Sequence, residues 1–246
     1  MINVLVNGAK GKMGQTVCAA VKADSELKLV AEADQGDDLS KMIKTSGAQG
    51  VVDFTHPSVR MTNVEAILKS GAYAVVGTTG YTPDDLKQIA TWCKETKRGC
   101  LIAPNFSIGA VLMMQFAAKA AVHMPEVEII EFHHKAKADS PSGTAIKTAE
   151  LIAEAQKAAG VGPSADPTHI WNLPESRGGD HAGIKVHAVR LPGFVASQEV
   201  ILGGLGQSLT IRHDTINREA FMPGVVWAIK KMHGRSELVY GLEHLL

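Results

Sequence analysis

The residues best suited to chemistry lie together in residues 131–145, which read EFHHKAKADSPSGTA. Two histidines and two lysines are followed within ten residues by Ser142, Gly143 and Thr144. Imidazole and ammonium groups transfer protons near neutral pH once their neighbours perturb them. Backbone N–H groups at the start of a helix bind anions. The stretch therefore predicts a pocket for a small anion.

The flanking patterns predict how these residues are positioned. Residues 127–132 have the apolar and β-branched character of a strand, and Ala145, Ala149 and Ile152 recur at helical spacing. The histidines thus follow a strand, and Ser142 lies at a helix start. Neighbouring strand residues point to opposite faces, so the strand must end or bulge at the histidines for both to enter one pocket.

Each feature alone also has an ordinary structural explanation. Ser142 can simply cap the helix, and a pair of histidines at a strand end is often structural. Their closeness, with Lys135, Lys137 and Asp139 between them, makes a functional site an equal alternative. The indication of a metal site formed by His133, His134 and His56 is weak, because no cysteine or paired carboxylate accompanies the histidines. We therefore predict no metal.

The N-terminus carries a second motif. A short apolar strand, residues 2–6, leads into GAKGKMG over residues 8–14, and a helical pattern follows. A second strand, residues 27–33, ends at Asp34. The glycines allow a pyrophosphate to approach the backbone at the helix start, and the acid can accept from the ribose. The spacing Gly-x-x-Gly-x-x-Gly differs from the commonest one, but the mechanism of dinucleotide binding is the same.

The charges near this loop leave the cofactor preference open. Asp34 should repel a 2′-phosphate and favour NADH, whereas Lys10 and Lys12 could neutralise a phosphate and favour NADPH. We therefore expect NADH and NADPH both to be used.

Strand and helix patterns alternate up to residue 103, which predicts a Rossmann-type doubly wound parallel sheet. Ligands of such sheets gather at the carboxyl ends of the strands. The loops expected there are residues 55–57, 77–80 and 103–107.

The second half of the chain has a different pattern. A helix buried on most faces is predicted over residues 108–124, and a long loop over residues 160–183. Consecutive strand patterns without intervening helices predict an α+β domain with a mixed or antiparallel sheet of about four strands, at residues 127–132, 185–190, 198–202 and 208–212. A helix over residues 218–232 is expected to return to the first domain.

The composition excludes several classes of protein. In 246 residues, 25 Lys and Arg balance 25 Asp and Glu, so no global field attracts nucleic acid or a membrane surface. Three cysteines without CxxC spacing favour reduced thiols in the cytoplasm. We expect no secretion signal and no membrane span.

Four motifs together carry a resemblance: GAKGKMG, GTTG at residues 77–80, APNFS at residues 103–107, and HHKAKADSPSGTA at residues 133–145. Through these motifs the protein resembles the 4-hydroxy-tetrahydrodipicolinate reductases, also called dihydrodipicolinate reductases, and in particular their actinobacterial members. The resemblance covers essentially the whole chain. The resemblance implies NAD(P)H-dependent reduction of a cyclic dicarboxylate to tetrahydrodipicolinate in the diaminopimelate route to lysine. Water is lost, hydride goes to ring C4, and the resulting enamine takes a proton at C3.

The resemblance also implies residue roles. His133 is the general acid/base and Lys137 the proton donor. The residues implied to bind substrate are His134, Ser142, Gly143 and Thr144. The residues implied to hold the cofactor are Gly8, Ala9, Lys10, Gly11, Lys12, Met13, Asp34, Gly77, Thr78, Thr79, Ala103, Pro104, Asn105 and Phe106.

Family members are homotetramers joined through the sheet of the second domain, with two domains that close on hinges. By resemblance, residues 1–104 and 218–246 form the dinucleotide-binding domain, and residues 105–217 the substrate-binding and tetramerisation domain. The hinges are expected near residues 103–106 and Arg218.

Two other functions stay open. Another two-domain NAD-dependent dehydrogenase would not explain a cluster of cations sized for a dicarboxylate. A non-catalytic NAD(H) sensor would not explain two proton carriers beside a helix start.

Overall fold

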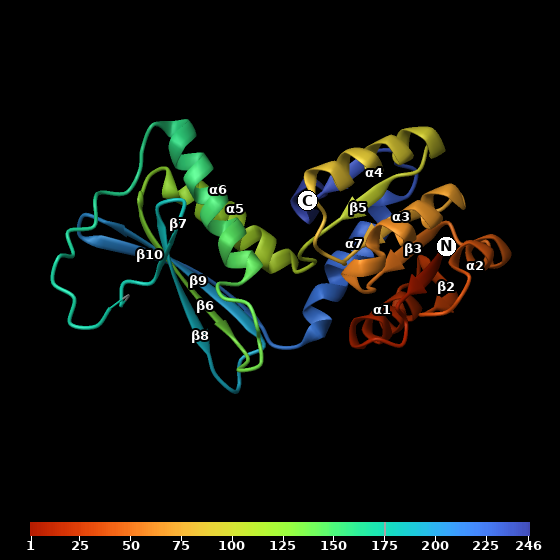
Figure 1. The fold of residues 1–246 in the computed structure, drawn as a ribbon, viewed down its shortest axis with the longest axis horizontal. Helices are drawn as coiled ribbons and strands as arrows, with labels where there is room; N and C mark the ends of the chain where they lie inside the picture. The colour runs from red at the N-terminus through yellow and green to blue at the C-terminus, as the bar shows by residue number, and fades with distance from the viewer. Residues whose placement is uncertain (175) are drawn as a thin grey trace. The chain divides into compact units, whose positions relative to one another are not determined.

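A computed structural model describes residues 1–174 and 176–246 of the chain (Figure 1). It separates into two compact units, Met1–Ile108 with Arg218–Leu246, and Gly109–Asn217. The sequence led us to expect the first boundary after residue 104. Residues up to 108 stay with the first unit because the Phe106 ring packs against Phe54, with centroids 5.6 Å apart. The binding roles assigned to the two domains remain predictions.

The first unit contains a six-stranded sheet in which every pairing is parallel, in the order β11-β5-β4-β3-β1-β2. Its strands are β1 (Ile2–Asn7), β2 (Leu27–Ala33), β3 (Gly50–Asp53), β4 (Tyr73–Val76), β5 (Cys100–Ile102) and β11 (Leu238–Tyr240). Every residue of β3 and β4 is buried, as expected for strands covered on both faces. The predicted doubly wound parallel sheet is confirmed.

Helices connect these strands. They are α1 (Lys12–Ala23), α2 (Leu39–Ser46), α3 (Arg60–Lys69), α4 (Pro83–Thr96) and α7 (Met222–Met232), with 3-10 turns at Pro57–Val59, Arg218–Phe221 and Leu242–His244. The sequence did not predict α2, a short helix that buries only Ile43 fully. The helix expected from residue 218 begins as a 3-10 turn, and its α-helical part starts at Met222.

The second unit contains a five-stranded mixed sheet in the order β10-β9-β6-β8-β7. Its elements are β6 (Glu126–His133), β7 (Gly179–His181), β8 (Ile184–Arg190), β9 (Ala196–Gly204) and β10 (Gln207–Thr215), with helices α5 (Ile108–Ala121) and α6 (Gly143–Ala159). β6 and β8 are parallel, and the other pairs are antiparallel. The fifth strand, β7, lies in the stretch expected to be a loop, because three residues are too few to show a strand period.

No helix in the described parts of the chain is both long and apolar enough to cross a membrane.

Candidate active site

The strand β6 ends at His133, one residue beyond the predicted end at residue 132, so His133 is its last residue and His134 follows it. Its pairing with β8 and β9 is regular up to His133. Because side chains alternate along a strand, Glu131 and His133 lie on the same face of the sheet. His134 lies beyond the end of the strand, so the alternation does not determine the direction of its side chain, which is exposed.

Glu131 is the centre of the cluster, although no sequence motif assigned it a role. Its side chain is fully buried and makes a close hydrogen bond to His133 Nδ1. Arg190 donates from Nη1 to Oε2 at 2.8 Å and from Nη2 to Oε1 at 2.6 Å. The backbone N–H of Ser142 donates to Oε1 at 3.1 Å. One carboxylate thus connects the strand end, β8 and the start of α6.

The same contacts set the protonation states. Desolvation lowers the pKa of His133 below its ordinary value, assisted by the charges of Lys137 and Arg190, although Glu131 opposes it. Desolvation alone would raise the pKa of Glu131, but hydrogen bonds from Arg190 and His133 lower it. Near neutral pH, Glu131 is therefore anionic and His133 is neutral.

Lys137 lies in the loop that follows β6. Its Nζ donates to Asp139 Oδ1 at 2.7 Å, and 19% of its side chain is exposed. Arg190 Nη2 also donates to the Asp139 backbone oxygen at 2.9 Å. Since Arg190 is held by Glu131, the loop that carries Lys137 is tied to the same buried carboxylate.

The start of α6 has features that suit an anion. Ser142 is the N-cap, and its Oγ accepts from the Ala145 N–H at 3.2 Å. Gly143 and Thr144 are the first two helical residues, where a helix supplies no acceptors of its own. A Cβ added to Gly143 would meet no atom within 4 Å, so there is room in front of its backbone. Partial positive charge at this end of the helix favours an anion there.

The glycine loop of the first unit has the close approaches that dinucleotide binding requires. Gly8 has a φ of +82°, and a Cβ there would lie 2.7 Å from the Phe54 backbone oxygen. A Cβ on Gly14 would lie 2.0 Å from the Gly8 oxygen. Gly11 is the N-cap of α1 and contributes no capping side chain. The helix start is thus bare enough for a pyrophosphate, and the predicted residues fit such a group.

The other residues predicted in this loop differ in their exposure to solvent. Ala9 is buried and Met13 is half-buried, whereas Lys10 and Lys12 are exposed and able to contact a phosphate. Asp34 accepts from the backbone N–H groups of Gln35 and Lys10, both at 2.8 Å. These two hydrogen bonds lower the pKa of Asp34, so its carboxylate is anionic at neutral pH.

Asp53, at the end of β3, is a second buried carboxylate without a predicted role. Its Oδ2 accepts from Asn7 Nδ2 at 2.8 Å and Asn63 Nδ2 at 2.9 Å. Its Oδ1 accepts from Thr55 Oγ1 at 2.7 Å and Thr78 Oγ1 at 3.2 Å. Asp53 therefore fixes the carboxyl ends of β1, β3 and β4 against one another.

The remaining predicted cofactor residues surround these strand ends. A Cβ on Gly77 would lie 2.0 Å from the Phe54 ring, so this close packing requires glycine. Thr78 is buried and donates its hydroxyl to Asp53, and Thr79 is exposed. Ala103 donates its N–H to the Val76 oxygen at 3.0 Å, and Phe106 is buried. Pro104 is exposed, and Asn105 Oδ1 accepts from the Ser107 N–H.

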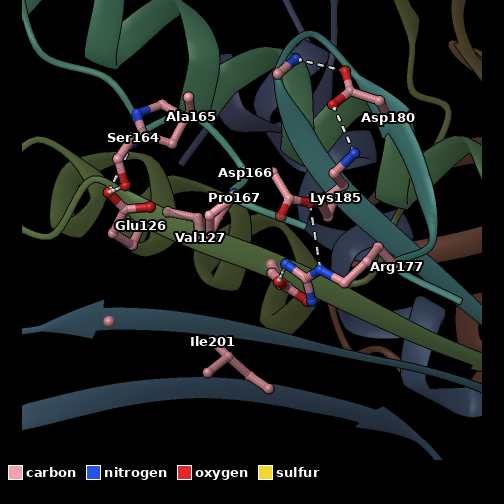
Figure 2. Close-up of a pocket in the computed structure, with 14 residues that line it drawn as sticks. Glu126, Val127, Ser164, Ala165, Asp166, Pro167, Arg177, Asp180, Lys185 and Ile201 are labelled. Atoms are coloured by element: carbon pink, nitrogen blue, oxygen red, sulfur yellow. Dashed lines mark hydrogen bonds and ion pairs between the residues drawn. The ribbon is translucent and has the colours of Figure 1, made fainter. Parts of the chain in front are cut away.

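A cavity of about 560 Å³ lies elsewhere in the second unit (Figure 2). Its cations are already paired: Arg177 contacts Glu128 at 2.5 Å and Asp166 at 3.4 Å, and Lys185 contacts Asp180 at 3.4 Å. With Glu126 also in its lining, carboxylates outnumber cations there. A dicarboxylate would be repelled, and none of the predicted site residues lines this cavity.

No group of three or more metal-ligating side chains is placed to hold a metal ion in the part of the chain that the structure describes.

Models of two protein domains match the chain. Residues 2–106 match "Dihydrodipicolinate reductase, N-terminus", and residues 109–246 match "Dihydrodipicolinate reductase, C-terminus".

Individual relatives agree. A 4-hydroxy-tetrahydrodipicolinate reductase of Mycobacterium marinum is 50% identical over 246 residues, covering 100% of this chain and 99% of that protein. The enzyme of the same name from Nocardia farcinica is 51% identical, covering 100% and 98%. Among solved structures, the dipicolinate-bound dihydrodipicolinate reductase of Paenisporosarcina sp. TG-14 superposes with a TM-score of 0.90 at 38% identity, covering 100% of both chains.

Proposed function

The chain belongs to the dihydrodipicolinate reductase family, and we propose that the end of β6, the loop after it and the start of α6 form the substrate half of its active site. The activity is that of a 4-hydroxy-tetrahydrodipicolinate reductase, an oxidoreductase of lysine biosynthesis that uses a reduced nicotinamide cofactor. The observation that carries the proposal is the hydrogen-bonded link, through Glu131, between His133 and the helix start at Ser142.

The proposed ligand is a small cyclic dicarboxylate. The Paenisporosarcina structure is described as dipicolinate-bound, and dipicolinate carries two ring carboxylates. We assign one carboxylate to the N–H groups of Gly143 and Thr144, beside the Ser142 cap, where the helix start favours negative charge. The exposed His134 side chain contacts the ring or its second carboxylate.

The proposed proton carriers are His133 and Lys137. His133, neutral before the substrate binds, serves as the general acid/base in the loss of the 4-hydroxyl as water. Lys137, an ammonium held by Asp139, gives the proton to C3 of the enamine. The reduced nicotinamide, when bound, supplies the hydride to C4 of the ring.

For the cofactor half we propose the glycine loop with Asp34, and the loops at the ends of β4 and β5. The proposed contacts are Gly8, Ala9, Lys10, Gly11, Lys12, Met13, Asp34, Gly77, Thr78, Thr79, Ala103, Pro104, Asn105 and Phe106. The bare start of α1 and the close packing at Gly8 and Gly14 support this assignment.

We propose that both NADH and NADPH serve. Asp34 keeps acceptor capacity for a ribose hydroxyl beyond its two backbone bonds, and Lys10 and Lys12 are exposed for a 2′-phosphate. Measured kcat/KM values should therefore differ by less than about a thousandfold, or about 4 kcal/mol, between the two cofactors. A larger preference in either direction would reject dual use.

We also propose a homotetramer joined through the sheet of the second unit. The support is β10, a nine-residue edge strand whose residues are mostly exposed, and such edges are usually paired or covered. Sedimentation at micromolar concentration should give four times the mass of 26.1 kDa. A monomer would contradict this part of the proposal.

A cytoplasmic location remains part of the proposal. Cys18, Cys93 and Cys100 are unpaired and buried, as is usual in a reducing compartment.

The experiment that tests the catalytic assignment is NADH oxidation with substrate made freshly by an aldolase from pyruvate and aspartate semialdehyde. His133→Ala should lower kcat by about a hundredfold or more with a smaller change in KM, as loss of general acid–base catalysis does. Lys137→Met should also act mainly on kcat. A rise in KM with kcat unchanged would assign these residues to binding instead.

A further inference from the structure

The buried carboxylate of Glu131 accepts hydrogen bonds from three other residues of the cluster. Its two oxygens accept from Arg190, Ser142 and His133, and none of the side chain is exposed. Building on the proposed function, we propose that Glu131 is a positioning residue. It holds His133 as the Nδ1–H tautomer, so that Nε2 exchanges protons with the substrate, and it fixes the loop that carries Lys137 and the start of α6 relative to that nitrogen.

The assignment of the tautomer follows from the chemistry of the partners. A carboxylate has only acceptors, so the hydrogen between Glu131 and His133 must belong to Nδ1. Arg190 is always a donor, and its two-pronged contact favours the ionised form of Glu131. A neutral imidazole with hydrogen on Nδ1 has its lone pair on Nε2, which is therefore the nitrogen able to accept a proton.

The Glu131–Arg190 ion pair is also connected to Lys137 and to the start of α6. Arg190 Nη2 bridges from Glu131 Oε1 to the backbone oxygen of Asp139, and Asp139 binds Lys137. The Ser142 N–H donates to Glu131 Oε1. Ser142 directly precedes Gly143 and Thr144, to which we assign a carboxylate of the substrate. Loss of the Glu131 charge would therefore disturb the proton carriers and the anion site together.

The chain contains a matched control three residues earlier on the same strand. Glu128 also binds one arginine and one histidine: Arg177 Nη2 at 2.5 Å and His187 Nε2 at 2.8 Å. This second trio lies on the opposite face of the sheet, where Glu128 and Arg177 line the cavity described above, and 34% of the Glu128 side chain is exposed. The same residue types therefore occur without any proposed catalytic neighbour.

The kinetic test compares Glu131→Gln with Glu128→Gln. The amide introduced by Glu131→Gln can present an N–H to His133, which would place the imidazole hydrogen on Nε2. Wrong-tautomer substitutions of this kind lower kcat by up to about 10⁴-fold. We expect Glu131→Gln to lower kcat about a hundredfold or more with a smaller rise in KM, because the anion site is disturbed as well, and Glu128→Gln to stay within about twofold of the parent protein in both constants.

The second readout is made on the parent protein. In ¹⁵N spectra of the intact protein labelled at histidine, with the His133 signals assigned by their loss in His133→Ala, His133 should carry its hydrogen on Nδ1 at pH 7.5. In Glu131→Gln, the hydrogen should move to Nε2. An Nε2–H tautomer in the parent protein would overturn the proposal, even if the Glu131→Gln variant did not fold.

The two tests also separate this inference from the proposed function. If Glu131→Gln raised KM alone, or behaved like Glu128→Gln, the positioning role would be rejected while the activity stood. If His133→Ala kept full kcat, the catalytic role of His133 would be rejected, whatever tautomer the spectra showed.

Discussion

At the scale of single residues, the environment of His133 determines its pH dependence. Desolvation, with Lys137 and Arg190 nearby, lowers the pKa of His133 below its ordinary value despite the Glu131 contact. The neutral, proton-accepting form should then persist down to pH values below about 6.5, the ordinary imidazole value. We predict that kcat/KM falls on the acid side only below that pH, and that His133→Ala removes this fall.

The pH profile of kcat/KM between about pH 5 and 8 checks this, because it reports on the free enzyme. A half-maximal point above the ordinary imidazole value, still dependent on His133, would contradict a desolvated environment for this side chain.

Gly143 offers a second test at this scale. A methyl group there meets no atom within 4 Å, so Gly143→Ala should leave the melting temperature unchanged or slightly raised. The same methyl group would occupy the space assigned to a substrate carboxylate. We predict a rise in KM for the substrate of about tenfold or more, about 1.4 kcal/mol, with the KM for NADH unchanged.

Gly162→Ala is the matched control, since a Cβ there also meets no atom within 4 Å but lies outside the proposed site. Equal KM values for the two variants would remove the helix start from the substrate site.

At the scale of elements, Asp53 ties three strand ends together. In Asp53→Asn, an NH2 group replaces one of the two acceptor oxygens. In either orientation of the amide this group would face N–H donors, either Asn7 and Asn63 or the backbone N–H of Thr55. Unmet buried hydrogen bonds cost about 1–3 kcal/mol, so we predict that loss in the free energy of unfolding together with a higher KM for NADH. Urea denaturation and steady-state kinetics measure the two effects.

The control for this prediction is Glu65→Gln on α3, where an exposed carboxylate pairs with Lys69. That variant should change the free energy of unfolding by less than about 0.5 kcal/mol. If Asp53→Asn changed the free energy of unfolding by as little as Glu65→Gln does, Asp53 would not be the link between the strand ends.

The elements also explain how much the sequence could predict. Continuous apolar runs identified β3 and β4, and the helical spacing after Ser142 identified α6. These signals are local. α2 was missed because it buries only Ile43 fully, and β7 was missed because it has three residues and pairs only with β8.

The contacts around the two buried carboxylates could not be predicted. Glu131 meets Arg190 across 59 residues, and Asp53 meets Asn7 across 46. Such pairs depend on strand order and register, which no local pattern encodes. A charged residue inside an apolar strand, as in VEIIEF, was the one available signal at Glu131, because burying a charge is costly unless it is paired.

At the scale of the whole molecule, the proposed cofactor residues and the proposed substrate residues belong to different units. All proposed cofactor residues lie in Met1–Ile108, and all proposed substrate residues lie in Gly109–Asn217. Variants in one unit should therefore act on one ligand: Gly143→Ala on the dicarboxylate, Asp53→Asn on the nucleotide.

The central claim is tested most directly by a crystal structure of this protein with pyridine-2,6-dicarboxylate. We predict that one carboxylate of the compound lies against the N–H groups of Gly143 and Thr144, with the ring beside His133 and His134. Density for the compound in the cavity at Arg177 and Lys185 alone, or anywhere away from the start of α6, would contradict the central claim.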